Sequence, residues 1–438
     1  MEHADLIIRA GWIIPVEPGD AILESHALII RDGTIAAIVP NAETDAISAE
    51  HVVDRPDHAL IPGLVNAHTH AAMSLLRGLA DDLPLMKWLS EHVWPAEQAH
   101  MSAEFVHAGA ELAVVEMLRG GTTCFSDMYF FPEVTGRVVS RAGLRAILGM
   151  IVFDFPSAYG EGAEDYLNKG LELHDAWRND PLVSTVFAPH APYTVSEPNL
   201  ERIRTLADEL DLPVHMHVHE TAHEVADSVE KSGGRPLARL DALGLVSPSL
   251  IAVHMTQVLD DEIRLLADKG VSVVHCPESN LKLASGFCPV QRLLDEGVNV
   301  AIGTDGAASN NDLDMIGEMR TAALLGKGIA GDAAALPAAT VLRMATLNGA
   351  RALGQGDRIG SLEVGKEADV VAVDLSRAAT QPIYNPLSQI VYAASRDQVS
   401  DVWVAGRHLL SECVPTTADA DAALRQARRW RDRICSTL

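Results

Sequence analysis

Basic residues are scarce in this chain. It carries 34 Lys and Arg against 60 Asp and Glu among 438 residues, which gives a formal net charge of −26. A surface that binds nucleic acid needs a basic footprint that neutralises phosphates and releases their counterions. The composition therefore predicts neither nucleic acid nor an anionic membrane surface as a partner.

Long apolar runs are also missing. No stretch approaches the roughly 18 consecutive apolar residues of a membrane span. The first residues, Met1 to Asp5, lack the basic flank and apolar segment of a signal peptide. We therefore expect a cytoplasmic protein without a membrane partner.

Cysteines and aromatic residues are few. The 5 cysteines are odd in number and have no CxxC spacing, so neither a disulfide framework nor a thiolate zinc site is indicated. Aromatics make up 5% of the chain, whereas hydrophobic residues reach 48% and charged residues 21%. This composition, with no low-complexity tract, is typical of a soluble enzyme whose core is mostly aliphatic.

Three kinds of pattern follow one another along the sequence. Residues 1–60 and 356–415 carry short alternating strands, which predict one small β-sandwich assembled from both segments. Between them, residues 61–355 alternate buried strands with helical patterns, as in the parallel sheet of a (β/α)8 barrel. Residues 416–438 predict a C-terminal helix, whose Trp430 is expected to cover the sandwich or a subunit contact.

Metal-ligand side chains stand at the ends of several predicted barrel strands. His68 and His70 end the first strand one residue apart, so both point to one face and can hold one metal ion. Barrel active sites form at the carboxyl ends of the strands. The eight strands are expected to end near His70, Asp127, Asp154, His190, His217, His254, Pro277 and Asp305.

On the fifth of these strands, three histidines are candidates for the metal ligand. His215, His217 and His219 have the same parity along a strand, so strand geometry alone does not choose among them.

Short motifs extend over nearly the whole chain. They are residues 62–70 (PGLVNAHTH), 120–123 (GGTT), 188–193 (APHAPY), 217–220 (HVHE), 275–280 (HCPESN), 303–306 (GTDG) and 360–369 (GSLEVGKEAD). This set resembles the amidohydrolase superfamily. More narrowly it is similar to the methylthioadenosine/S-adenosylhomocysteine deaminases, relatives of chlorohydrolases and guanine deaminases.

The resemblance implies one divalent metal ion, usually zinc. Its ligands would be His68, His70, His217 and Asp305, with a position left for water, whose pKa the metal lowers. Members with two metals carry a carboxylated lysine on the fourth strand. Residues 183–189 contain no lysine, which favours a single metal.

The resemblance also implies a hydrolytic deaminase. Glu220 would protonate a ring nitrogen of adenine, and its spacing selects His217 as the ligand. Asp305 would take a proton from the attacking water and pass it to the departing amine, while His254 orients that water. Of the flanking histidines, His219 is expected to reach the pocket.

A segment after the first strand, residues 83–97, is similar to the substrate lid of this subgroup. By resemblance Glu97 accepts hydrogen bonds from the ribose hydroxyls and Trp88 packs near the 5′ substituent. His190 and Glu220 would contact the purine. A carboxylate that accepts a vicinal diol selects nucleosides, because a ligand without those donors leaves it unpaired.

One position departs from the pattern. Met150 stands where some homocysteine-binding members have an arginine, and a carboxylate tail would lose that charge-assisted partner. As a substrate-contacting residue, Met150 would favour 5′-methylthioadenosine over S-adenosylhomocysteine, with adenosine also accepted. Arg137 or Arg141 of a neighbouring subunit is the alternative source of the charge.

Two other readings remain open. A triazine chlorohydrolase or a guanine deaminase would use the same metal and scaffold, but neither has a use for a ribose contact at Glu97. A metal-free relative without catalysis is disfavoured by the complete set of ligands and acid/base groups. A homo-oligomer, dimer or tetramer, is expected because symmetric oligomers are common among soluble enzymes.

Overall fold

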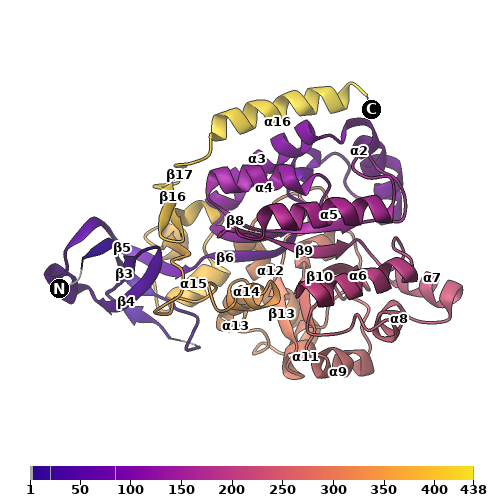
Figure 1. The fold of residues 1–438 in the computed structure, drawn as a ribbon. Helices are drawn as coiled ribbons and strands as arrows, with labels where there is room; N and C mark the ends of the chain where they lie inside the picture. Colours follow the sequence, from indigo (N-terminus) through magenta and orange to yellow (C-terminus); the bar gives the residue numbers. More distant parts are fainter. Residues whose placement is uncertain (1–2, 20, 84, 438) are drawn as a thin grey trace.

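A parallel barrel forms the centre of the molecule (Figure 1). The computed structural model describes residues 3–19, 21–83 and 85–437. Within these residues, eight parallel strands pair in chain order and confirm the predicted barrel. They are β6 (Leu64–Thr69), β7 (Thr122–Asp127), β8 (Arg145–Val152), β9 (Val183–Pro189), β10 (Val214–Val218), β11 (Leu250–His254), β12 (Ser272–His275) and β13 (Asn299–Ile302). Most are buried throughout their length, as strands covered on both faces must be.

Side chains complete the ring between the first and last strands. The amide of Asn66 accepts the backbone N–H of Thr304 at 3.0 Å and donates to the Thr304 hydroxyl at 2.7 Å. The backbone N–H of Asp305 donates to the carbonyl of His68 at 3.0 Å. This closure places the end of β13 directly beside the two histidines that end β6.

Helices pack around the strands of the barrel and against its ends. They include α3 (Ala103–Arg119), α4 (Pro132–Ala142), α5 (Ala163–Trp177), α6 (Glu197–Leu210), α7 (Ala222–Ser232), α8 (Pro236–Ala242), α9 (Asp260–Asp268), α10 (Pro277–Lys282), α11 (Val290–Asp295), α12 (Met315–Ala330), α13 (Ala338–Met344) and α14 (Leu347–Ala352). The Ser102 hydroxyl caps α3 by accepting the N–H of Phe105, and Thr221 caps α7 in the same way. Gly143, with φ of 79°, ends α4 in the left-handed conformation that glycine adopts most easily.

The terminal segments form one mixed sheet beside the barrel (Figure 1). Its described strands are β1 (Ala4–Ile13), β2 (Leu23–Glu24), β3 (His26–Arg31), β4 (Thr34–Pro40), β5 (Ala49–Pro62), β14 (Val370–Asp374), β15 (Val399–Val404), β16 (Arg407–Ser411) and β17 (Val414–Pro415). The sheet curls, so Leu28 of β3 and Trp403 of β15 belong to one apolar core. Gly63 joins β5 to β6, where a Cβ would lie 2.0 Å from the Thr123 hydroxyl.

A buried ion cluster fastens the barrel to this sheet. The guanidinium of Arg145, on β8, donates to Asp369 at 3.0 Å and to Glu367 at 2.7 Å. Both carboxylates lie just before β14, and Asp369 also accepts the N–H of Ala405 at 2.9 Å. Arg145 is 1% exposed and Asp369 is 2% exposed, so this cluster is shielded from water.

The C-terminal helix α16 (Ala420–Cys435) lies over α3, not over the β domain (Figure 1). The ring of Trp430 meets Phe105 edge to face at 5.3 Å between centroids. The Thr437 hydroxyl lies 2.6 Å from His100 Nε2. The prediction that Trp430 covers the sandwich is therefore wrong, and the alternative, a subunit contact of this helix, stays a prediction. Among the helices of the described ranges, none combines the length and apolar character that a membrane crossing requires.

Candidate active site

Four predicted ligands meet at the carboxyl ends of the barrel strands. His68 Nε2 lies 3.1 Å from His217 Nε2 and 3.5 Å from Asp305 Oδ1. His70 Nε2 lies 3.1 Å from the same oxygen of Asp305. His68 belongs to two groups whose ligand atoms could share a metal ion, one with His70 and Asp305 and the other with His217 and His254. Three imidazole nitrogens and one carboxylate oxygen, from the four predicted ligands, are a donor set that suits zinc with one position left open.

The hydrogen bonds behind the histidines fit a metal ion. His70 Nδ1 donates to the carbonyl of Met128 at 2.5 Å, and His217 Nδ1 donates to the carbonyl of His190 at 2.8 Å. Each bond fixes the tautomer that leaves a lone pair on Nε2, the atom facing the cluster. Burial lowers the pKa of His68 to about 4, so this ligand is neutral.

His215 supports the cluster from behind. Its Nε2 lies 3.0 Å from His68 Nδ1, and its Nδ1 lies 3.0 Å from the Ser126 hydroxyl. His219 faces away, and its Nε2 accepts the backbone N–H of Leu237 at 3.1 Å. The prediction that His219 reaches the pocket is wrong, and His215 is the flanking histidine at the site.

Asp305 is held by hydroxyl groups. Its Oδ2 accepts hydrogen bonds from Ser279 at 2.6 Å and from Ser309 at 2.7 Å. Burial opposes ionisation, but the neighbouring imidazoles of His68 and His70 outweigh it and hold the pKa of Asp305 well below its usual range. The carboxylate is therefore ionised, the form in which it can bind a metal ion.

His254 and Glu220 stand beside the cluster. His254 Nδ1 lies 2.9 Å from Asn280 Oδ1, and its Nε2 points to Glu220 Oε2 at 4.0 Å. Asn280 thus sets the orientation of the imidazole. Burial raises the pKa of Glu220, which favours its protonated form and suits a proton donor.

A cavity of about 710 Å³ opens over these groups. Its outer wall is the predicted lid, built from α1 (Leu85–Trp88), a π-helical turn (Leu89–Val93) and α2 (Trp94–His100). Trp88 and Glu97 line the cavity from this lid, and His190 lines it from the barrel. Single π-helical turns are often found at functional sites.

Glu97 carries the carboxylate of the lid. Its Oε1 accepts the Tyr129 O–H at 2.5 Å. Burial within the cavity raises the pKa of Glu97 to about 7, although the Tyr129 hydroxyl acts in the opposite direction.

Met150 lies outside the cavity. Its side chain is buried against α5, where a Cβ on Gly170 would come within 2.9 Å of it. The neighbouring residues Ile151 and Phe153 line the cavity instead. The prediction that Met150 contacts the substrate is wrong, because alternate residues of a strand point to opposite faces.

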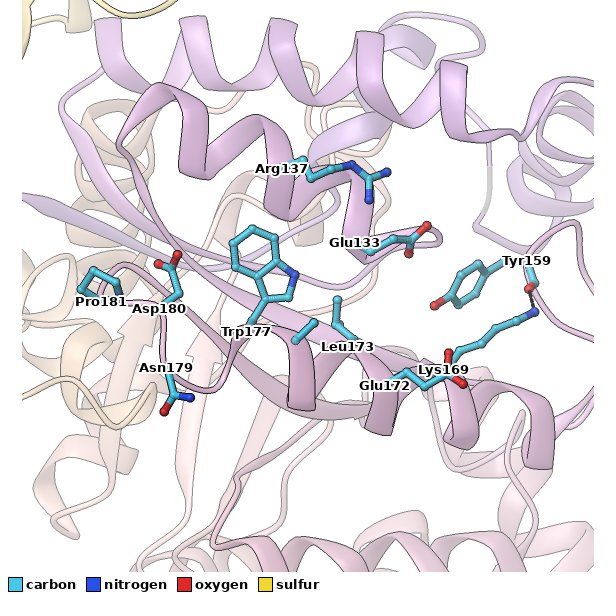
Figure 2. A pocket seen from close by; sticks show the side chains of 11 residues that line it. Glu133, Arg137, Tyr159, Lys169, Glu172, Leu173, Trp177, Asn179, Asp180 and Pro181 are labelled. Carbon is cyan, nitrogen blue, oxygen red and sulfur yellow. Dashed lines mark hydrogen bonds between the residues drawn. The ribbon is translucent and has the colours of Figure 1, made fainter.

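A second hollow, of about 820 Å³, lies on the outside of the barrel between α4 and α5 (Figure 2). Trp177 and Leu173 form its apolar part, and Arg137 and Glu133 reach it from α4. Its lining holds neither histidine nor cysteine among the described residues. It therefore lacks the imidazole ligands of the inner cavity, although Glu133, Glu172 and Asp180 bring carboxylates to its lining.

Sequence reasoning did not assign roles to Ser279, Asn280, Ser309 and Tyr129. The first two lie in the HCPESN motif, which signalled a functional segment without assigning a role to its polar residues. Ser309 lies in a loop four residues after Asp305, and Tyr129 lies in a loop two residues after Asp127. No local sequence pattern marks either residue.

Comparisons with known proteins identify the family. A model of the amidohydrolase family matches residues 59–409. The chain is 50% identical over 432 residues to a 5-methylthioadenosine/S-adenosylhomocysteine deaminase of Saccharophagus degradans, covering 98% of this chain and 97% of that protein. It is 58% identical to an adenosine deaminase of Xanthomonas campestris, whose crystal structure holds zinc, with a TM-score of 0.98 and 99% of each chain covered. A zinc complex of atrazine chlorohydrolase from Arthrobacter aurescens shares the fold at 23% identity and a TM-score of 0.91, covering 97% of this chain and 100% of that one.

Proposed function

This chain belongs to the amidohydrolase family, and we propose that it deaminates adenine nucleosides, releasing ammonia and the inosine analogue. The observation that carries the proposal is the pairing of two carboxyl groups in one cavity. Glu220 lies beside the metal-ligand cluster, and Glu97 faces the cavity from the lid. Glu220 is suited to protonate a ring nitrogen of the purine, and Glu97 is suited to accept hydrogen bonds from the ribose diol.

The cofactor is one divalent metal ion, as in the zinc-containing structure of the Xanthomonas deaminase. His68, His70, His217 and Asp305 would hold it, and when bound it supplies Lewis-acid activation of the attacking water. No cysteine belongs to this donor set within the described residues.

The chain's own groups then move the protons. Glu220 donates a proton to N1 of adenine, which makes C6 electrophilic. Asp305 accepts one proton from the attacking water and passes it to the amino group, which leaves as ammonia. The second proton of that water returns to Glu220 as the C6 carbonyl forms. His254, whose ring is held by Asn280, would orient the attacking water.

The 5′ subsite favours an uncharged substituent. The described residues that line the cavity include no lysine and no arginine, whereas Trp88, Phe155 and Leu283 give it an apolar wall. A methylthio group finds apolar contacts there, but the carboxylate of a homocysteine tail finds no cation. The preference for 5′-methylthioadenosine thus rests on the whole wall and not on Met150.

The test is a comparison of substrates by ultraviolet absorbance. Zinc-loaded enzyme should convert 5′-methylthioadenosine with a kcat/KM about 10- to 100-fold above that for S-adenosylhomocysteine, the cost of one missing charge-assisted hydrogen bond. Adenosine should also be converted. If the enzyme converted only guanine or only a chlorotriazine, the proposal would be overturned in favour of a guanine deaminase or a triazine chlorohydrolase. Glu97→Ala gives a further check, since it should raise KM only for nucleosides.

The Glu97 carboxylate predicts a pH dependence of nucleoside binding. Because burial raises its pKa to about 7, the ionised form that accepts the diol is lost as the pH falls below that value. We expect kcat/KM for 5′-methylthioadenosine to drop about tenfold per pH unit on the acid side. The measurement is a pH profile from 5 to 9. In Glu97→Gln the fall of kcat/KM on the acid side should be absent. If the fall persists unchanged in that variant, a group other than Glu97 causes it.

Two further expectations concern the cell and the assembly. We propose a homo-oligomer, dimer or tetramer, which sedimentation can check, and residence in the cytoplasm, which fractionation can check.

A further inference from the structure

Tyr129 connects the lid to the barrel at the point where the ribose is expected to bind. It follows β7 by two residues, is 5% exposed and lines the inner cavity. Its O–H donates to Glu97 Oε1 at 2.5 Å, across a separation of 32 residues in the sequence. Within the described residues, the Glu97 side chain has no second hydrogen-bond partner.

The ring of Tyr129 is fixed by its neighbours. Phe130 lies 5.4 Å away between ring centroids, and His70 lies 6.3 Å away. The tyrosine also belongs to the apolar cluster that contains Trp88 and Val93 of the lid. Its hydroxyl is therefore a donor in a defined position, whereas Glu97 sits on a helix of only 7 residues.

A carboxylate has four lone-pair sites on two oxygens, and one donor fixes its orientation without filling it. With Oε1 bound to Tyr129, the second oxygen and one further lone pair remain for two ribose hydroxyls. An unanchored glutamate would sample several rotamers and lose that freedom on binding substrate.

We propose that Tyr129 is a positioning residue for ribose recognition: its hydroxyl anchors Glu97 so that the carboxylate meets the 2′- and 3′-hydroxyls of the nucleoside. The inference rests on the proposed function. It adds that specificity for nucleosides depends on a barrel residue as well as on the lid.

The test is Tyr129→Phe, which keeps the ring and removes the hydroxyl. We expect KM for 5′-methylthioadenosine to rise about 10-fold, with kcat changed less than twofold, because a hydrogen bond to a charged group is lost. For 2′,3′-dideoxyadenosine, which has no diol, KM should stay the same. Tyr159→Phe is the matched control, since Tyr159 lines the outer hollow and its hydroxyl has no hydrogen bond among the described residues (Figure 2).

A double-mutant cycle separates positioning from a general structural role. In a Glu97→Ala background, Tyr129→Phe should have no further effect on KM. An equal rise in KM for the dideoxynucleoside, or a persisting effect without Glu97, would overturn the inference while the deaminase assignment stands. If the wild-type enzyme deaminates no nucleoside, the proposed function itself fails. Zinc content and thermal midpoint of each variant verify that the fold is retained.

Discussion

Replacing Glu220 by glutamine is expected to lower kcat for nucleoside deamination by about 10²- to 10⁴-fold, the usual contribution of a general acid. Glutamine has the shape of glutamate but no acidic proton to give to N1. Burial raises the pKa of Glu220, which favours the protonated form that this step needs. The measurement is steady-state kinetics with 5′-methylthioadenosine.

Metal content distinguishes this loss from damage to the site. Glu220 Oε2 lies 4.0 Å from His254 Nε2, and Glu220 is not among the residues whose ligand atoms are placed to hold a metal ion. Glu220→Gln should therefore keep about one zinc ion per chain, whereas His217→Ala should lose metal and activity together. A Glu220→Gln variant that lacks zinc, or that keeps more than a tenth of the wild-type rate, would contradict the proton-donor role.

Strand alternation explains what the sequence could and could not place. His68 lies in β6, and His70 directly follows the strand with an extended φ of −124°, so the alternation continues through both residues and correctly predicted that their side chains meet. The same rule failed at His219, which lies beyond the end of β10 at Val218 and has a φ of 53°. A left-handed residue breaks the alternation, so parity no longer tells where the side chain points.

At Met150, in contrast to His219, the alternation rule holds and contradicts the predicted role. It lies inside β8, where alternation does hold, and the inward-facing positions are its neighbours on either side, such as Ile151. Resemblance alone had placed it at the substrate, although parity was available to test that placement. The strand rule is the better guide wherever the residue lies within a strand.

Contacts between distant segments could not be read from the sequence. The amphipathic pattern of α16 predicts a helix with one apolar face, but it does not say that Trp430 packs on Phe105 of α3. The bond from Tyr129 to Glu97 likewise joins a loop and a lid that have no common periodicity. Such contacts depend on tertiary packing, which local patterns do not encode.

Replacing Arg145 by methionine is expected to lower the free energy of unfolding by about 3–5 kcal/mol, the cost of breaking a buried ion pair by removing one partner. Asp369 would remain buried at 2% exposure, with its charge unpaired beside the N–H of Ala405. Because Arg145 reaches from β8 to the segment before β14, the loss should loosen the attachment of the β sheet to the barrel. Urea unfolding followed by circular dichroism measures the change.

The double variant Arg145→Met with Asp369→Asn separates charge from packing. It replaces the unpaired Asp369 carboxylate by an amide and should recover a large part of the lost free energy of unfolding. A neutral buried amide costs less than an unpaired buried charge. Arg204→Ala, which breaks an exposed pair with Asp208 on α6, is the control and should change stability by less than about 0.5 kcal/mol. If Arg145→Met were as mild as Arg204→Ala, the ion cluster would not be what fastens the terminal sheet to the barrel.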